Sequence, residues 1–332
     1  MNQRKILRAS GIAVLCILSV VVLGVIYITC LLPSVPLEKK LKITATPEQL
    51  ARGRYLFETV AGCKECHSSR DQKLFAMPVT EGTTGEGGEV FDSKKGFPGT
   101  YIAKNLTPYH LGNWTDAELF RAITSGVGKD GHALFPIMPY QAFAHADKED
   151  IYSIISYLRT LKPIAKDWPV SHSDFPMNLI IHTMPAKPDF HPVPSKENTV
   201  AYGGYLVNMA SCVTCHSQVD KGKIIEGMQF AGGRKFPLPT GGIVSSANIT
   251  PDIETGIGGW TREVFMQRFM SYADSGFTAA PVTPGTFNTI MPWTQFAKML
   301  PEDLSAIYDY LRTVKPIKNK VVKFSKNAVS KS

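Results

Sequence analysis

The pattern of hydrophobic and polar residues separates an apolar N-terminal run from a body of short amphipathic segments. From Gly11 to Leu32 no residue is charged, and Val, Ile and Leu dominate. At a helical rise of about 1.5 Å, these 22 residues span about 33 Å, which matches the thickness of a bilayer core. We therefore predict that residues 11–32 form an uncleaved transmembrane anchor.

Cleavage of this run is the alternative. A signal peptide has an apolar region of only about 7–15 residues and ends at a small-x-small site, which the sequence lacks before Pro33. A lipoprotein signal ending at Cys30 would require small residues where Tyr27 and Ile28 stand. Flanking charge does not set the orientation, because three basic residues lie on each side of the run. They are Arg4, Lys5 and Arg8 before it, and Lys39, Lys40 and Lys42 after it.

The body is predicted to be all-α, with short helices separated by long loops. Thr46 and Thr115 are predicted N-caps, because Gln49 and Glu118 stand three residues after them and complete capping boxes. Pro47 suits the first position of the first of these helices. No stretch of sustained alternation predicts a large sheet.

Two further helices are predicted from apolar stripes at helical spacing. One begins near Asp147 and the other at Pro301. The stripes are Ile151, Ile154, Ile155 and Leu158 in the first, and Leu304, Ile307, Tyr308 and Leu311 in the second.

The body contains one unit twice. Five segments recur in the same order, at an offset of 143 to 153 residues. In the first copy they are Cys63-Lys64-Glu65-Cys66-His67, Asn105-Leu106-Thr107-Pro108, Trp114-Thr115, Ile137-Met138-Pro139-Tyr140 and Tyr-Leu-Arg-Thr-Leu-Lys-Pro-Ile at 157–164. In the second they are Cys212-Val213-Thr214-Cys215-His216, Asn248-Ile249-Thr250-Pro251, Trp260-Thr261, Ile290-Met291-Pro292-Trp293 and Tyr-Leu-Arg-Thr-Val-Lys-Pro-Ile at 310–317. Chance does not explain this order, so we predict two related domains.

Residues between the copies are predicted to form a linker. Residues 165–197 carry six prolines, which favours a semi-rigid spacer over a third domain. The Gly-rich stretch from Gly82 to Gly88 lacks a following Gly-Lys-Ser/Thr, so we predict a loop there, not a phosphate site. The predicted organisation is a cytoplasmic tail at 1–10, the anchor at 11–32, a first domain at 47–164, the linker at 165–197, a second domain at 198–317 and a basic tail at 318–332.

Four of the six cysteines belong to the repeated Cys-x-x-Cys-His motif, whereas Cys16 and Cys30 lie inside the apolar run. This motif is the attachment signature of c-type haem. Two thiols one helical turn apart can both form thioethers with one porphyrin, and the adjacent histidine can then ligate the iron. We therefore predict two covalently bound haem c groups. The attaching residues are Cys63 and Cys66, and Cys212 and Cys215, with His67 and His216 as iron ligands.

A zinc site and a redox dithiol are the alternatives for these cysteines. Zinc sites pair two Cys-x-x-Cys sets about 15–20 residues apart, whereas these sets are 146 residues apart. A redox dithiol requires a strand–helix context and gives no reason for the histidine that follows.

The repeat also indicates the second iron ligand. Met-Pro occurs at Met77, Met138, Met184 and Met291. Only Met138 and Met291 occupy equivalent places, 71 and 75 residues after the two motif histidines. The proline fixes the local backbone and can hold the thioether sulfur toward iron, whereas gap-filling in a core is the alternative role of a methionine.

His132 and His145 compete as ligands of the first haem. The second copy has no histidine at the matching places, so we expect both at the surface or beside the propionates. Iron with six ligands leaves no site for a substrate, which favours electron transfer over catalysis. We predict no catalytic residue.

These motifs resemble the class I cytochrome c family. The elements Asn-Leu/Ile-Thr-Pro, Gly-x-Trp-Thr, Met-Pro-aromatic and Tyr-Leu-Arg are similar to those of the membrane-bound multihaem cytochrome subunits that accompany bacterial alcohol, aldehyde and gluconate dehydrogenases. The likeness covers roughly residues 47–164 and 198–317 and implies two tandem class I cytochrome c domains behind one N-terminal transmembrane helix. Such subunits usually carry three haem motifs and a C-terminal anchor, whereas this chain has two motifs and an N-terminal apolar run.

The resemblance has further implications for each domain. In this family an N-terminal helix with a glycine and an aromatic residue crosses the C-terminal helix, and Gly53 with Tyr55 and Gly203 with Tyr205 fit this description. The axial pairs implied are His67 with Met138 and His216 with Met291. Haem is attached outside the bacterial cytoplasmic membrane in this family, which places residues 1–10 inside and both domains on the periplasmic side.

The function implied is a relay of single electrons, without enzymatic activity of the chain's own. The donor expected is a membrane or periplasmic dehydrogenase, and the acceptor a terminal oxidase or a soluble cytochrome. The alternative is a cytochrome c subunit of a haem–copper oxidase. A dihaem peroxidase fits less well, because it must open one distal face to peroxide and both positions here carry equivalent methionines.

Composition and charge support this interpretation. With 44% hydrophobic residues the chain is not predicted to be disordered. Its formal net charge is +8, but residues 1–8 and 315–332 carry nine basic residues and no acidic ones, so the remainder nets −1. Nucleic acid is therefore not an expected partner. We expect the C-terminal tail to be mobile and free to touch lipid or a partner, and four haem propionates to make the electron-transferring surface acidic.

Overall fold

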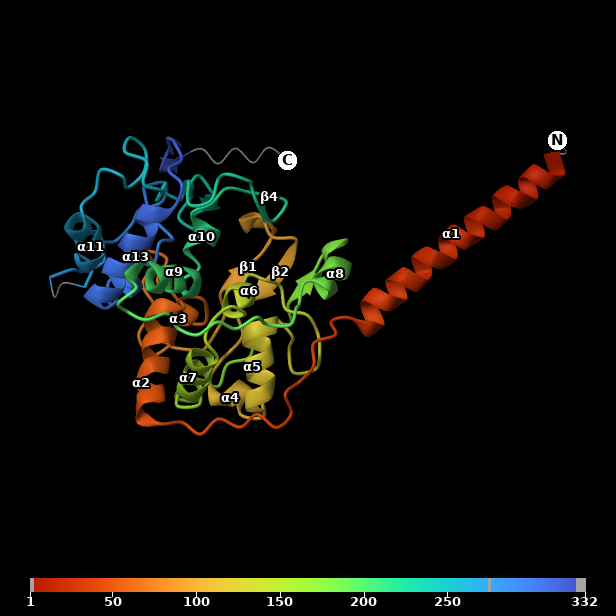
Figure 1. The fold of residues 1–332 in the computed structure, drawn as a ribbon, viewed down its shortest axis with the longest axis horizontal. Coiled ribbons are helices and arrows are strands. Elements are labelled where there is room, and N and C mark those ends of the chain that lie inside the picture. The colour runs from red at the N-terminus through yellow and green to blue at the C-terminus, as the bar shows by residue number, and fades with distance from the viewer. Residues whose placement is uncertain (1–2, 274–275, 327–332) are drawn as a thin grey trace.

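One long helix stands apart from a body in which the two halves of the chain pack together (Figure 1). The structure, a computed structural model, describes residues 3–273 and 276–326. Residues 1–2 of the predicted cytoplasmic tail and 327–332 of the predicted basic tail, with Lys331, lie outside the described residues. Helix α1 spans Gln3–Leu31 and extends away from the body. Its segment Leu7–Leu31 has a mean hydropathy of 2.9 and is not buried, so by length and composition it can cross a membrane, as a signal sequence also could.

The first half contains six helices of α type and a π-helical turn. They are α2 (Pro47–Tyr55), η1 (Leu56–Val60), α3 (Cys63–Cys66), α4 (Pro108–Leu111), α5 (Asp116–Ser125), α6 (Tyr140–Phe143) and α7 (Lys148–Leu158). The capping boxes predicted at Thr46 and Thr115 are confirmed, with Gln49 and Glu118 as their partners. Helix α7 begins after the N-cap Asp147 and buries its predicted apolar stripe.

The second half repeats this frame. Its helices are α9 (Thr199–Met209), α10 (Cys212–Cys215), α11 (Arg262–Met270), α12 (Trp293–Phe296) and α13 (Pro301–Thr313). Helix α13 begins at Pro301 as predicted and buries Leu304, Ile307 and Leu311, while Tyr308 is half-buried.

The body is mostly helical, as predicted, but it also contains small sheets that the all-α prediction did not include. Three small antiparallel sheets occur among the described residues, in the orders β1-β2-β3, β4-β5 and β6-β7-β8. The strands are two to four residues long, which is too short for an alternating pattern to reveal them. They are β1 (Val90–Phe91), β2 (Gly99–Ile102), β3 (His172–Ser173), β4 (Val219–Asp220), β5 (Lys223–Ile224), β6 (Lys235–Pro237), β7 (Ile243–Ser245) and β8 (Phe324–Ser325), and the 3-10 turn η2 (Ser93–Lys95) lies between β1 and β2.

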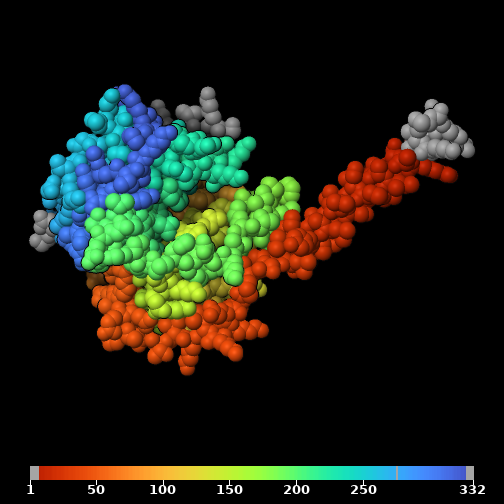
Figure 2. All heavy atoms as spheres, in the orientation of Figure 1, coloured from red at the N-terminus to blue at the C-terminus, as the bar shows by residue number. Residues whose placement is uncertain are grey.

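Parts of the predicted linker and of the predicted basic tail pack on the body. Strand β8, within the predicted basic tail, pairs with β7, so this part of the tail is packed on the second half. The predicted linker 165–197 contains β3, α8 (Met177–Ile180) and the 3-10 turn η3 (Ile181–Thr183). Strand β3 pairs with β2, and Trp168 Nε1 donates to Glu86 O at 2.6 Å. Figure 2 shows this green segment running along the junction between the two halves.

In each half the first helix crosses the last at a glycine. A Cβ atom on Gly53 of α2 would lie 1.8 Å from Ser153 O of α7. A Cβ atom on Gly203 of α9 would lie 1.9 Å from Ala306 O of α13. Only a hydrogen fits at these distances, so the two glycines set the close approach of each helix pair.

The two halves contact each other through equivalent residues. Tyr55 OH donates to Asp303 Oδ2 at 2.6 Å, and Tyr205 OH donates to Asp150 Oδ2 at 2.5 Å. Tyr55 corresponds to Tyr205 in the repeat, and Asp150 corresponds to Asp303. Each half therefore supplies the same hydroxyl to the same buried carboxylate of the other, so the halves are related by an approximate twofold axis.

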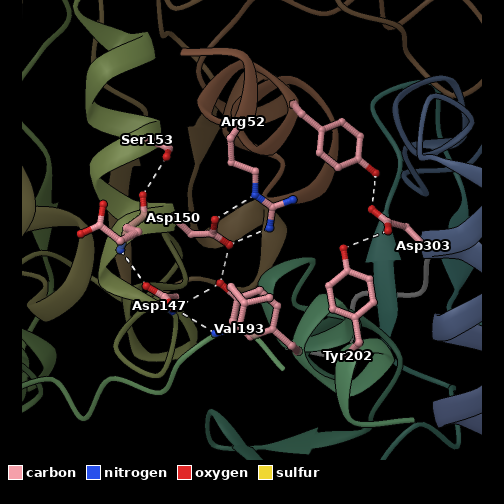
Figure 3. Close-up of polar contacts among 10 residues, drawn as sticks. Arg52, Asp147, Asp150, Ser153, Val193, Tyr202 and Asp303 are labelled. Atoms are coloured by element: carbon pink, nitrogen blue, oxygen red, sulfur yellow. Dashed lines mark hydrogen bonds and ion pairs between the residues drawn. The ribbon is translucent and has the colours of Figure 1, made fainter. Parts of the chain in front are cut away.

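The symmetry of this interface breaks at one position. Arg52 pairs with Asp150 at 2.7 Å, whereas the equivalent residue, Tyr202, donates its hydroxyl to Asp303 Oδ1 at 2.9 Å. Figure 3 shows the guanidinium reaching Asp150 on one side and the Tyr202 ring reaching Asp303 on the other. One carboxylate is thus neutralised by a cation and the other is held by two tyrosine hydroxyls.

Candidate functional site

Each Cys-x-x-Cys-His motif forms a single helical turn. Helix α3 follows Gly62 and α10 follows Ser211, both in the left-handed conformation, with φ of 69° and 52°. The four thiols are free. Because residues three apart share one face of a helix, both thiols of each turn point to the same side, as thioether formation with one porphyrin requires.

The histidine of each motif is held by one ring nitrogen. His67 Nδ1 lies 2.7 Å from Lys104 O, and His216 Nδ1 lies 2.7 Å from Ala247 O. A carbonyl oxygen only accepts hydrogen bonds, so each Nδ1 carries the proton and donates it. Each Nε2 therefore keeps its lone pair, which is how histidines are presented to metals in proteins.

The Asn-x-Thr-Pro motif positions these carbonyls. Asn105 Oδ1 accepts from Thr107 N at 2.9 Å and from Thr107 Oγ1 at 2.7 Å, while Asn105 Nδ2 donates to Ile164 O at 2.8 Å. The same bonds recur in the second half, with Asn248, Thr250 and Ile317. The asparagine of the motif thus binds the Lys-Pro-Ile segment that follows the last helix. It also fixes the peptide group that precedes it, and the carbonyl of that peptide group accepts the hydrogen bond from the motif histidine.

Two glycines that sequence reasoning missed complete this arrangement. Gly87 N donates to His67 O at 3.0 Å, and Gly232 N donates to His216 O at 2.8 Å. Their φ values are +80° and +70°, and a Cβ on either would lie within 3 Å of the backbone of the Asn-x-Thr-Pro loop. A longer comparison of the two copies would have aligned these glycines, but only the structure shows what they contact.

The thiols and imidazoles of the two motifs are packed among protein atoms but remain partly exposed. Burial raises the pKa of Cys63 and of Cys212 to about 12, and it lowers the pKa of His67 and of His216, so both imidazoles stay neutral. Solvent nevertheless reaches the side chain of Cys66. In each motif, two free thiols and a neutral imidazole are surrounded by protein yet accessible to solvent. This environment fits the covalent attachment of haem c.

The two attachment turns lie near each other across the interface. Burial raises the pKa of Cys66 to about 11, and the Cys215 thiol of the other half adds to the rise. Gln295 of the second half also donates to Thr59 O of the first, at 2.6 Å, close to the start of α3. The approximate twofold axis therefore brings the two motifs together.

The predicted axial methionines have equivalent backbone settings. Met138 and Met291 are half-buried, and each precedes a proline that caps a short helix, α6 or α12. Tyr140 N donates to Met138 O at 2.7 Å, and Trp293 N donates to Met291 O at 2.8 Å. The other two Met-Pro pairs do not match each other, because Met77 is buried in a loop of the first half and Met184 follows η3.

The competing histidines lie where the sequence predicted. His132 is exposed and contacts Asp130. His145 is exposed after α6 and faces the linker.

Comparison with known proteins points to one class. No family model matches the chain. It is 29% identical over 237 residues to the cytochrome c subunit of alcohol dehydrogenase (quinone) from Gluconacetobacter polyoxogenes, covering 66% of this chain and 49% of the relative. It is 28% identical over 281 residues to the fructose dehydrogenase cytochrome subunit of Gluconobacter japonicus, covering 80% and 52%. It is also 26% identical over 279 residues to a diheme cytochrome c-type protein of Cereibacter sphaeroides, covering 81% and 87%.

Two turns that each present a pair of thiols and an oriented imidazole define a c-type cytochrome. The similarities support this class and the prediction of an electron-transfer subunit, because the relatives are cytochrome c subunits of dehydrogenases and a diheme cytochrome c-type protein. More particularly, the chain is a relative of the cytochrome c subunits of bacterial membrane dehydrogenases and of a diheme c-type cytochrome. It spans about half the length of the alcohol and fructose dehydrogenase subunits that it matches.

Proposed function

We propose that this chain is a membrane-anchored dihaem electron carrier built from two class I cytochrome c domains, at 47–164 and 198–317. The observation that carries the proposal is the twofold occurrence of one arrangement, in which two thiols share a helical turn and an imidazole keeps Nε2 free. The attaching residues are Cys63, Cys66, Cys212 and Cys215, and the axial pairs are His67 with Met138 and His216 with Met291.

Bound haem supplies a one-electron iron couple, and the chain's residues set its surroundings. The two thiols of each helical turn would attach the porphyrin covalently through thioethers. The hydrogen bond at Nδ1 orients each histidine and raises its basicity as a ligand. Met138 and Met291 would each supply a second ligand to the iron and leave no position for water or substrate, and methionine–histidine ligation would favour a high reduction potential. The domains therefore carry electrons and leave substrate chemistry to other proteins.

The interface supports transfer between the two haems. Reciprocal tyrosine–carboxylate bonds join the halves, and the two attachment turns lie near each other. This arrangement would allow one chain to accept an electron at one haem and release it from the other.

The anchor and the partners follow from the same proposal. Helix α1 would hold the domains on the periplasmic face, with residues 1–10 inside. The relatives are subunits of dehydrogenases, which favours a membrane or periplasmic dehydrogenase as donor and a terminal oxidase or soluble cytochrome as acceptor. Mild detergent extraction should copurify the donor; a copper-containing catalytic subunit in its place would favour the oxidase alternative.

The decisive experiment is a haem count on the purified full-length chain. We expect two covalent haems, and one haem in each of the double variants Cys63→Ala/Cys66→Ala and Cys212→Ala/Cys215→Ala. The matched control is Cys16→Ala/Cys30→Ala, which removes the two thiols of α1 and should retain two haems. A wild-type chain with zinc and no covalent haem would overturn the proposal.

A further inference from the structure

A cluster of two histidines and one aspartate lies on the surface, away from both Cys-x-x-Cys-His motifs in the sequence. His145 follows α6, and Asp189 and His191 belong to the linker. All three are exposed, and their potential ligand atoms lie within 4.8 Å of one another. The proposed electron-transfer function uses none of them.

The backbone fixes the two segments that carry this cluster. Asp189 N donates to Ala144 O at 3.0 Å, and His191 N donates to Ala146 O at 3.3 Å. Two residues further on, Val193 N donates to the Asp147 carboxylate at 2.9 Å, a bond visible in Figure 3. The linker is therefore held beside the loop that carries His145. Backbone hydrogen bonds, and not only side-chain positions, bring the three residues of the cluster together.

The residue between the two linker ligands faces the other way. Phe190 packs against Phe120 in the hydrophobic core, with ring centroids 5.3 Å apart. Alternate residues of an extended segment point to the same side. Because Phe190 points inward, Asp189 and His191 both project outward, beside His145.

The imidazoles are arranged as metal ligands. His145 Nδ1 lies 3.2 Å from the carbonyl of Asp189, so Nδ1 donates its proton and Nε2 keeps its lone pair. This is the same device that holds His67 and His216. The His145 and His191 rings stack with centroids 5.9 Å apart, and His191 Nε2 lies 3.5 Å from Asp189 Oδ2. Two imidazoles and a carboxylate thus converge on one point.

We propose that His145, Asp189 and His191 bind one divalent transition-metal ion of the Zn²⁺ type. Two histidine nitrogens and one carboxylate oxygen are a common zinc donor set, with water completing the tetrahedron. Ligands at about 2.0–2.1 Å from zinc lie about 3.4 Å apart, which rotation of these exposed side chains can reach. The bound ion would cross-link the linker to the first domain, next to the N-cap of α7.

Zinc titration of the full-length dihaem protein tests this site. The protein is purified without a polyhistidine tag, stripped with a chelator and titrated with zinc sulfate, with binding followed by calorimetry and by metal analysis after dialysis. We expect one zinc per chain. Removing even an outer partner of a metal site commonly weakens binding about 10- to 100-fold, so His145→Ala and His191→Ala should each weaken it by at least about 10-fold. The haem count and haem spectrum should not change.

The chain offers a matched control. His172 is also exposed and has an aspartate, Asp174, at 3.9 Å, but it lies in strand β3 of the linker and is not part of the cluster. His172→Ala should bind zinc like the wild type. Asp189→Asn keeps the backbone bonds of the linker and should weaken zinc binding, which separates ligand loss from misfolding. The site is refuted if the wild type binds no zinc, or if His145→Ala and His191→Ala bind it as tightly as His172→Ala.

Discussion

Single atoms decide how each motif histidine is presented. The carbonyls of Lys104 and Ala247 accept a bond from Nδ1 and thereby leave Nε2 with its lone pair free, as the proposed iron ligation requires. Each carbonyl is fixed by the asparagine that follows it, and each loop can approach only because a glycine stands opposite, at Gly87 or Gly232. The repeated Asn-x-Thr-Pro motif contains no candidate iron ligand, but it positions the carbonyl that orients the motif histidine.

The axial methionines can be tested one haem at a time. Replacing Met138 or Met291 with alanine should abolish the methionine–iron charge-transfer absorption of that haem and leave the absorption of the other. Both variants should keep two covalent haems, because the thiols are untouched. Met184→Ala is the control, and an unchanged spectrum in Met138→Ala or Met291→Ala would contradict the assignment.

Replacing either helix-crossing glycine with a larger residue should lower the stability of the protein considerably. Gly53→Ala and Gly203→Ala would each force a methyl group against a backbone carbonyl of the facing helix, at 1.8 and 1.9 Å if nothing moved. Overpacking of this kind costs about 1–3 kcal/mol or more, measured as the free energy of unfolding in denaturant. At Gly259 the only neighbour is Ile253 O at 3.9 Å, so Gly259→Ala should change the stability little.

At the scale of elements, the structure pairs α2 with α7 and α9 with α13, then joins the two pairs through their tyrosines and aspartates. These hydrogen bonds link residues that are equivalent in the repeat. The two copies therefore form a shared interface and are not independent domains joined only by the linker. Arg52 and Tyr202 mark where the two copies have diverged within this shared interface.

The interface bonds predict a coupling between the halves. Tyr205→Phe removes a hydroxyl that donates to the buried Asp150, and hydrogen bonds to charged groups contribute about 1.5–3 kcal/mol. We expect the free energy of unfolding to fall by about that amount. The control is Tyr109→Phe, where the tyrosine is 48% exposed and bonds Asp167 at 3.1 Å; it should change stability by less than about 0.5 kcal/mol. Equal effects of the two variants would contradict the role of the interface.

The same tyrosines predict a loss of stability in alkali. Burial and the neighbouring carboxylates raise the pKa of Tyr55, Tyr202 and Tyr205 well above the value of about 10 that tyrosine has in an unfolded chain. The folded protein then holds more protons than the unfolded chain above that pH. The contribution to stability is therefore complete below about pH 10 and declines as the pH rises further. Unfolding measured from about pH 8 to about pH 11 should show this decline, and it should be shallower in Tyr55→Phe/Tyr205→Phe.

At the scale of the whole molecule, α1 extends away from the body, and its apolar segment Leu7–Leu31 is not buried. An exposed apolar surface of this length is not stable in water, which supports its proposed place in a membrane. The compact body with two attachment sites lies entirely after it.

Retention of the anchor is directly measurable. The cytochrome extracted from membranes should have the intact mass of a chain that includes residues 11–32 plus two haems. Without detergent it should aggregate or stay in the membrane fraction. Recovery of a mature protein that begins after residue 30 would show cleavage and contradict the anchor.

The sequence by itself determined the features that rest on local spacing. The Cys-x-x-Cys-His motifs, the capping boxes, the apolar stripes of α7 and α13 and the long apolar run all depend on residues within one or a few helical turns. The repeat added the equivalence of the two halves. Local chemistry thus sufficed for the class of protein and for its candidate haem-attaching residues.

Only the tertiary structure decided what joins residues that are distant in the chain. Tyr55 and Asp303 are 248 residues apart, and His145 meets Asp189 across 44. No periodicity encodes such a pairing, because it depends on how two completed helix pairs face each other and where the linker comes to rest. For the same reason the short strands and the paired C-terminal segment escaped prediction: their hydrogen bonds are made by the fold and not by the local sequence.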